Sequence, residues 1–238
     1  MIGATTLLVL AALCAPGAGT IDADTGRVSV DGGTLFYDDR GAGPVIVLMH
    51  AGGRDHTMWD AQARTFTRGF RVIRFDLRGH GRSTARLGPF SLVDDLRRVL
   101  DHLQVEHARL VGVSMGSGVA LDAAFQIPDR VDRIVLVSYA GSPPGVPTAP
   151  GSVDPRTPEG QARLAELSIP VLVVVGERDA AATHALADIL AGGVQDGEKV
   201  VIGDAGHLPS LDQPADFDRQ VLRFLRQRRR GDDRGRAP

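Results

Sequence analysis

The chain has 238 residues, long enough for one domain with a sizeable core. Its 43% hydrophobic and 24% charged side chains exclude a disordered or fibrous protein. A net charge of −2 and an aromatic content of 5% argue against a nucleic-acid partner, and the single cysteine, Cys14, excludes an internal disulfide or a thiolate metal site.

The N-terminus resembles a secretory signal peptide. Residues 1–20 have no charged side chain, residues 7–13 are apolar, and the small residues Gly17, Ala18 and Gly19 follow. The apolar run is too short to span a bilayer as a helix, although it also lacks the usual basic residues before it. We predict a signal peptide at residues 1–19, a secreted or periplasmic protein and no stable membrane insertion; the alternative is a mis-set start and a cytoplasmic protein.

Strand-like and helix-like segments alternate along the rest of the chain. Two short apolar stretches flank Asp31-Gly32-Gly33, which predicts an antiparallel hairpin within residues 28–37. Continuous β-branched runs predict strands buried on both faces at residues 45–49, 72–75, 110–113, 134–137, 171–175 and 200–202. Amphipathic patterns predict helices at residues 60–67, 91–103, 115–127, 183–191 and 215–227. This order predicts an α/β fold with a mainly parallel, eight-stranded sheet and helices on both faces.

One stretch interrupts the alternation. Residues 140–167 contain six prolines, and only residues 157–167 have a helical pattern, with Pro158 suited to the first turn. A linker between two domains is one interpretation. The alternation resumes at Ile169, however, so we favour an excursion from one sheet within a single domain at residues 27–229. Residues 230–238 are rich in Arg, Asp and Gly, which predicts a solvated, disordered tail.

A candidate nucleophile lies in the motif Gly112-Val113-Ser114-Met115-Gly116. An apolar strand leads directly into this G-x-S-x-G pattern, and a helix rich in small residues leaves it. Flanking glycines allow a sharp turn that exposes the serine above the sheet, and the N-terminus of the following helix favours a developing oxyanion.

A serine hydroxyl needs a base, and a histidine base needs a carboxylate partner. His207 follows the last predicted strand and Asp179 follows the strand before it, so both are expected at the same sheet edge as Ser114. Glu177 and Asp154 are the alternative carboxylates. The chain order Ser, Asp, His favours Asp179.

Five other histidines are weaker candidates for a functional role. His56 and His80 lie in loops at the same rim, where either could contact a substrate. His184, His102 and His107 fall in or beside predicted helices, where surface or packing roles suffice.

Together these features resemble the α/β-hydrolase superfamily over residues 33–225. Further matching segments are the His-Gly loop region at 49–53, the D-x-R-G-x-G-x-S turn at 76–83, the helix start at 114–121 and the histidine segment at 206–217. The resemblance implies that Ser114 is the nucleophile, His207 the general base and then acid, and Asp179 its orienting carboxylate. It further implies that the backbone N–H groups of Met115 and Gly52 form the oxyanion hole.

The chain departs from the superfamily pattern in two ways. Ala51 replaces the usual glycine after the histidine of the oxyanion loop, which weakens the assignment of Gly52. The segment at residues 140–167 is much shorter than the helical lid found in many members, so the site is expected to be open to water and bulky substrates. The serine nucleophile disfavours epoxide hydrolase and haloalkane dehalogenase chemistry.

The resemblance implies a serine hydrolase acting on a small-molecule ester, thioester or lactone through an acyl-enzyme. No metal-ligand or phosphate-binding motif is present in the sequence, so no cofactor or metal is expected. Two alternatives use the same three residues, a carbon–carbon bond hydrolase and a cofactor-free perhydrolase. A third, of another class, is a non-catalytic receptor that binds a small molecule on the same fold.

Overall fold

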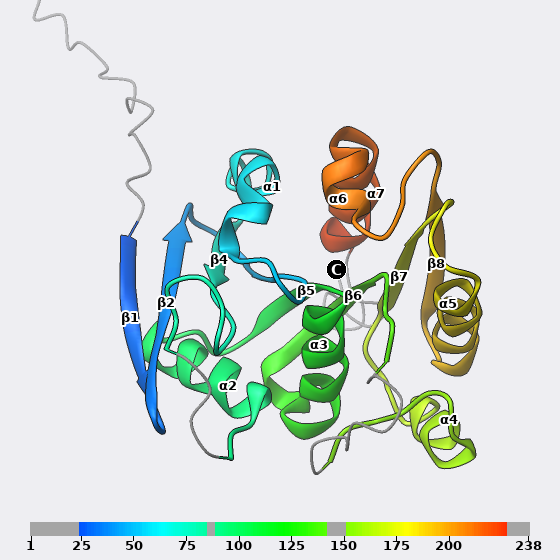
Figure 1. Ribbon diagram of the computed structural model, residues 1–238, viewed down its shortest axis with the longest axis horizontal. Coiled ribbons are helices and arrows are strands. Elements are labelled where there is room, and N and C mark those ends of the chain that lie inside the picture. The colour runs from blue at the N-terminus through cyan, green and yellow to red at the C-terminus, as the bar shows by residue number, and fades with distance from the viewer. Residues whose placement is uncertain (1–23, 85–88, 142–150, 228–238) are drawn as a thin grey trace, which may run out of the picture.

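A computed structural model describes residues 24–84, 89–141 and 151–227 (Figure 1). The predicted signal peptide, the predicted tail at 230–238 and the middle of the proline-rich stretch lie outside these residues. In the described ranges, no helix combines the length and the apolar character needed to cross a membrane.

One eight-stranded sheet organises the chain, in the order β1-β2-β4-β3-β5-β6-β7-β8. The hairpin strands pair antiparallel, β2 also pairs antiparallel with β4, and all other neighbours are parallel. The strands are β1 Asp24–Val30, β2 Gly33–Arg40, β3 Val45–Met49, β4 Arg71–Phe75, β5 Ala108–Val113, β6 Val131–Val137, β7 Val171–Gly176 and β8 Gly197–Ile202. The predicted mainly parallel sheet is confirmed.

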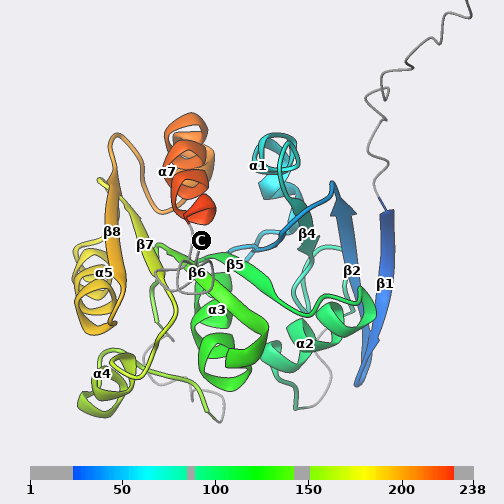
Figure 2. The same cartoon turned by 180° about the vertical axis from the view of Figure 1, so that it is seen from behind.

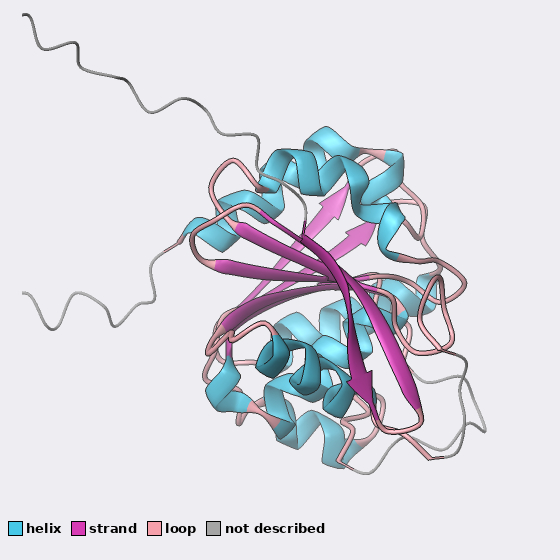
Figure 3. Cartoon of the chain, turned by 90° about the vertical axis from the view of Figure 1, so that its left-hand side faces the viewer, coloured by secondary structure: helices cyan, strands magenta, loops and turns pink. Residues whose placement is uncertain are grey.

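Helices cover both faces of this sheet, as Figures 2 and 3 show. They are η1 His56–Trp59, α1 Asp60–Phe66, α2 Leu92–His102, α3 Met115–Gln126, η2 Pro128–Arg130, α4 Pro158–Leu164, α5 Ala181–Gly193, α6 Pro209–Asp212 and α7 Pro214–Arg226. Residues of α2, α3 and α5 share one apolar core, and residues of α1 and α7 share another on the opposite face. The short helices η1, η2 and α6 were not predicted from the sequence.

Strand β3 shows why the apolar runs are continuous. Val47 and Met49 belong to the core under α2 and α3, whereas Ile46 and Leu48 belong to the core under α1 and α7. Successive side chains of a strand point to opposite faces, so a strand covered on both faces is apolar at most positions. Burying each such side chain contributes about 1.5–3 kcal/mol.

Just after residue 150, the proline-rich stretch is attached to α3. The carboxylate of Asp122 accepts hydrogen bonds from the Ser152 hydroxyl (2.6 Å) and the Val153 N–H (3.0 Å). Burial raises the pKa of Asp122 despite these hydrogen bonds. Asp122 lies eight residues beyond Ser114, about 12 Å along the helix. This anchored part of the excursion is therefore well removed from the serine turn.

Candidate active site

Ser114 occupies the turn between β5 and α3. Its φ of 51° and ψ of −109° lie in a region that L-residues rarely adopt. The turn is fixed by a hydrogen bond from the Ser114 N–H to the Val137 carbonyl on β6 (2.9 Å). On the helix side, the backbone N–H and the hydroxyl of Ser117 both donate to the Ser114 carbonyl, at 3.0 and 2.5 Å. These contacts hold the serine in its strained conformation at the carboxyl edge of the sheet.

The glycines on either side of Ser114 are required by close backbone packing. A Cβ on Gly112 would lie 2.1 Å from the Gly116 carbonyl oxygen, and a Cβ on Gly116 would lie 2.3 Å from the Met49 carbonyl oxygen. Any side chain at either position would push α3 away from β5 or β3. The G-x-S-x-G spacing therefore sets how closely the serine turn approaches the end of β3 and the loop that follows it.

His207 and Asp179 meet at the ends of β8 and β7. Both carboxylate oxygens of Asp179 lie 3.0 Å from His207 Nδ1. Burial opposes ionisation of Asp179, but hydrogen bonds from the Ala180 N–H (2.7 Å) and from His207 outweigh it, so the pKa of Asp179 lies below its usual value. An ionised carboxylate accepts from Nδ1–H, which leaves Nε2 of the 41% exposed His207 side chain as the proton acceptor.

Hydrogen bonds join the two loops that carry this pair. The Arg178 N–H donates to the Ala205 carbonyl (2.8 Å), and the Asp204 N–H donates to Glu177 Oε2 (2.9 Å). The side chains of Arg178 and Asp204 also form an ion pair. A Cβ on Gly176 would lie 2.1 Å from the Gly206 carbonyl oxygen, so only glycine allows the loops to approach this closely.

The two alternative carboxylates have other partners. Glu177 binds the backbone of Asp204, and Asp154 forms a two-point ion pair with Arg156 (2.8 and 2.8 Å). Among the described residues, only Asp179 shares a hydrogen bond with the His207 ring. Glu177 therefore has a role that the sequence did not suggest, as a bridge between the loops.

The oxyanion-loop segment is held by the buried His50. Its Nδ1–H donates to the Ala51 carbonyl (2.8 Å) and its Nε2 accepts the Leu77 N–H (2.8 Å). Burial lowers the pKa of His50, so the ring is neutral. Gly52, which follows, lies against Met115: a Cβ built on it would be 4.0 Å from Met115 Cβ.

An alanine at position 51 fits this loop. Ala51 does not have a positive φ, whereas Gly53 does, at 69°. The Ala51 methyl group is buried in the core under α1 and α7. The departure from the usual glycine therefore leaves the geometry of Gly52 beside Met115 intact.

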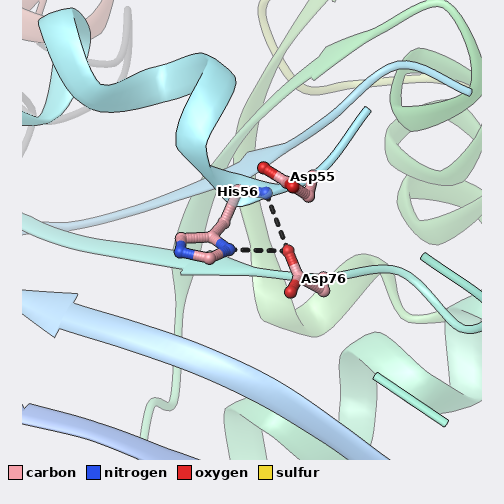
Figure 4. A group of neighbouring side chains, drawn as sticks. All are labelled: Asp55, His56 and Asp76. Atoms are coloured by element: carbon pink, nitrogen blue, oxygen red, sulfur yellow. Dashed lines mark hydrogen bonds and ion pairs between the residues drawn. The ribbon is translucent and has the colours of Figure 1, made fainter. Parts of the chain in front are cut away.

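A second histidine–aspartate pair lies further along the same loop (Figure 4). The backbone N–H and Nδ1 of His56 both lie 2.7 Å from Asp76 Oδ1, and the Arg82 N–H donates to Asp76 Oδ2 (2.7 Å). Burial opposes ionisation of Asp76, but these hydrogen bonds keep its pKa below the usual value. The His56 side chain is only 9% exposed, so it is turned into the protein, whereas His80 remains half-exposed at the rim.

Asp55, His56 and Asp76 bring possible metal ligands within 4.8 Å of one another. Most of their oxygen atoms already accept hydrogen bonds, however. Both oxygens of Asp76 do so, and Asp55 Oδ1 accepts the N–H (2.9 Å) and the hydroxyl (2.5 Å) of Thr57. We interpret the group as a hydrogen-bonded clamp between this loop and the turn at residues 76–83.

The structure thus brings Asp179 to His207 and Gly52 to Met115. In the described part of the chain, no hydrogen bond joins the Ser114 hydroxyl to His207. Sheet topology nevertheless puts both residues at the same edge, because β5, β6, β7 and β8 are successive parallel strands. Such bonds are often long without a bound substrate.

Comparisons with known proteins agree with this architecture. A family model described as the alpha/beta hydrolase fold matches residues 44–164, about half of the chain. The 3-oxoadipate enol-lactonase 2 of Acinetobacter baylyi is 26% identical over 249 aligned positions, covering 82% of this chain and 92% of that protein. The crystal structure of the enol-lactonase from Burkholderia xenovorans LB400 has a TM-score of 0.72 and 27% identity, covering 85% of this chain and all of that one.

Higher identity occurs over shorter segments. An uncharacterised protein of Mycobacterium tuberculosis is 38% identical over 104 residues, which is 42% of this chain and 30% of the mycobacterial protein. The matched segment therefore spans less than a third of that relative.

Proposed function

Because the chain belongs to the α/β-hydrolase fold family, we propose that it is a serine hydrolase that cleaves a carboxylic ester, thioester or lactone. The single observation that carries the proposal is the His207–Asp179 pair, which lies at the sheet edge where Ser114 sits in its strained turn. Serine, imidazole and carboxylate in these relations are the parts of an acyl-transfer site.

In the proposed reaction, His207 Nε2 takes the proton of the Ser114 hydroxyl while Oγ forms a bond to the substrate carbonyl carbon. The resulting tetrahedral intermediate breaks its bond to the leaving oxygen or sulfur, which takes the proton from His207. Water then attacks the acyl-enzyme by the same two steps and releases the acid. Asp179 stays ionised throughout and stabilises the imidazolium.

The negative charge on the intermediate needs hydrogen-bond donors. We assign this role to the backbone N–H groups of Met115 and Gly52, the first residue of α3 and its neighbour in the oxyanion loop. Donors of this kind contribute about 10²- to 10³-fold to the rate. His50 supports them by fixing the carbonyl of Ala51.

The lactone class has specific support from the relatives. Two proteins named as enol-lactonases align over 92% and 100% of their length with this chain, at 26% and 27% identity. A lactone carbonyl requires the same nucleophile, base and oxyanion donors as a linear ester. We therefore place lactones beside short-chain esters in the first set of substrates to test.

The test is turnover of p-nitrophenyl acetate and of a γ-lactone by the wild type and by Ser114→Ala. We expect the Ser114→Ala rate to fall at least about 10³-fold. A fluorophosphonate probe should label Ser114 in the wild type and fail to label His207→Ala. His184→Ala, at a half-buried position on α5, is the matched control and should retain labelling.

Three results would contradict the proposal. Equal turnover by wild type and Ser114→Ala would exclude a serine nucleophile. Cleavage of a carbon–carbon bond or formation of a peracid, with no ester or lactone turnover, would favour the alternative chemistries. Saturable binding of a small molecule without any Ser114-dependent turnover would favour a receptor.

A further inference from the structure

Three fully buried side chains near α1 each have an unpaired polar atom. Trp59, Gln62 and Ser210 are all 0% exposed. In the described part of the chain, Trp59 Nε1, Gln62 Oε1 and Ser210 Oγ have no hydrogen-bond partner. An unsatisfied buried polar group costs free energy, so three in one region require an explanation.

Contacts link the segments that carry these three side chains. Gln62 Nε2 donates to the Ser210 carbonyl (3.1 Å) and to Asp218 Oδ1 (3.0 Å). Because both partners are acceptors, the NH₂ end of the amide must face them, which leaves Oε1 as an unpaired acceptor. Trp59 lies three residues before Gln62, and its ring is 6.1 Å from that of Phe217, the neighbour of Asp218.

The unpaired atoms are complementary to one small polar molecule. The indole N–H is a donor, the amide oxygen is an acceptor, and the serine hydroxyl is either. We propose that a single internal water molecule binds between Trp59 Nε1, Gln62 Oε1 and Ser210 Oγ. The water accepts a hydrogen bond from the Trp59 indole N–H and donates one to Gln62 Oε1. Its third hydrogen bond joins it to the Ser210 hydroxyl, which can donate or accept. Three bonds are typical of a buried structural water.

This water site joins two segments of the proposed active site. Trp59 and Gln62 follow directly from the loop that carries Gly52, and Ser210 lies three residues after His207. The Gly206 N–H donates to Asp212 Oδ2 (2.8 Å), which ties the loop that carries His207 to α6. This segment in turn is attached to α1 through Gln62 and the proposed water. On this view, which rests on the proposed function, Gln62 is a positioning residue for His207.

The first experiment measures whether Ser210→Ala raises or lowers Tm. Without the water, the Ser210 hydroxyl is an unpaired buried group, so Ser210→Ala should raise Tm. With the water, Ser210→Ala removes one of its hydrogen bonds and should lower Tm by about 2–4 °C. The control Ser29→Ala, at an exposed position on β1, should change Tm little. A rise in Tm for Ser210→Ala would overturn the proposal.

The second experiment observes the water directly. Trp59 is the only tryptophan in the chain, so ¹⁵N-labelled protein has a single indole N–H resonance. We expect a dipolar cross-peak in a rotating-frame experiment between this proton and water, and its loss in Ser210→Ala. Absence of the cross-peak in the wild type would also overturn the water site. Neither measurement depends on catalysis, so both remain decisive if the proposed function fails.

The third experiment tests the positioning role. The methionine of Gln62→Met is similar in size to glutamine but has no amide. We therefore expect kcat for p-nitrophenyl acetate to fall about 10- to 100-fold, while KM changes less than about twofold. The matched control is Gln195→Met, because Gln195 is exposed and donates only to the Ala165 carbonyl (2.8 Å). An unchanged kcat for Gln62→Met would overturn the positioning role.

Discussion

Two histidine–aspartate pairs occur among the residues that the structure describes, and they differ mainly in exposure. His56 lies 2.7 Å from Asp76, with side chains 9% and 0% exposed, and the ring of Phe36 is 4.9 Å from that of His56. His207 lies 3.0 Å from Asp179, with side chains 41% and 4% exposed. The comparison teaches that the pairing itself does not mark a reactive histidine. What distinguishes His207 is a partly exposed ring at the sheet edge that carries Ser114.

The two aspartates are alike in charge. In both, burial opposes ionisation and hydrogen bonds reverse its effect, so both have a pKa below the usual value. Asp76 uses its charge to hold two backbone N–H groups, whereas Asp179 receives only one from the backbone. The same charged group thus serves packing in one place and, in the proposed mechanism, proton transfer in the other.

The largest expected effect separates the two histidines. His207→Ala should lower kcat/KM about 10⁵- to 10⁶-fold with little change in stability, because the ring is partly solvated. His56→Ala should leave activity per folded molecule within about tenfold but destabilise the fold by about 2–4 kcal/mol, because it leaves Asp76 buried and short of a partner. Activity assays and urea unfolding of both variants check this. A catalytic loss in His56→Ala as large as in His207→Ala would contradict the distinction.

A smaller contrast is expected between the two aspartates. Asp179→Asn should lower kcat by about 10³- to 10⁴-fold, since an amide no longer fixes the histidine tautomer. Asp76→Asn should cost about 1–3 kcal/mol of stability, because its NH₂ group would face the Arg82 N–H or the His56 donors. Single-turnover kinetics and thermal unfolding measure the two effects. Similar kinetic losses for both variants would show that the clamp and the proposed catalytic pair are not separable.

The smallest effect concerns Asp122, whose pKa is raised, whereas the pKa values of Asp76 and Asp179 are lowered. Burial raises the pKa of Asp122, so its ionisation weakens the fold as pH rises through that pKa. Asp76 and Asp179, with lowered pKa values, add stability above about pH 4 and lose it as pH falls. Asp122→Asn should therefore raise Tm by about 1–3 °C at pH 8, with the gain vanishing near pH 4. A gain that grows on acidification would contradict the assigned direction.

Much of the fold could be predicted because it depends on local pattern. The runs of β-branched residues predicted β3 to the residue and the other parallel strands to within three residues at either end, since a strand covered on both faces is apolar at most positions. The sharp turn at Ser114 could be predicted because Gly112 and Gly116 flank it between a strand and a helix. The pairing of His207 with Asp179 followed from topology, because both residues leave adjacent parallel strands at one edge.

The remaining features depend on contacts between distant segments. Nothing local marks Gln62 as the partner of Ser210, 148 residues away. The burial of His56 follows from the position of Asp76 on another loop, so the sequence could not separate it from the half-exposed His80. Helix α6 has only four residues, too few for a periodic pattern.

The attachment of the proline-rich excursion to α3 has a consequence for the evolution and engineering of this scaffold. Gly141 and Gly151 both have positive φ, at 70° and 82°, and Asp122 holds the returning chain just after the second of them. The two glycines therefore flank residues 142–150, and neither of them lies in a strand. Because Asp122 holds Ser152 and Val153 on α3, changing the number of residues between the two glycines should leave β6, β7 and the Ser114 turn undisturbed.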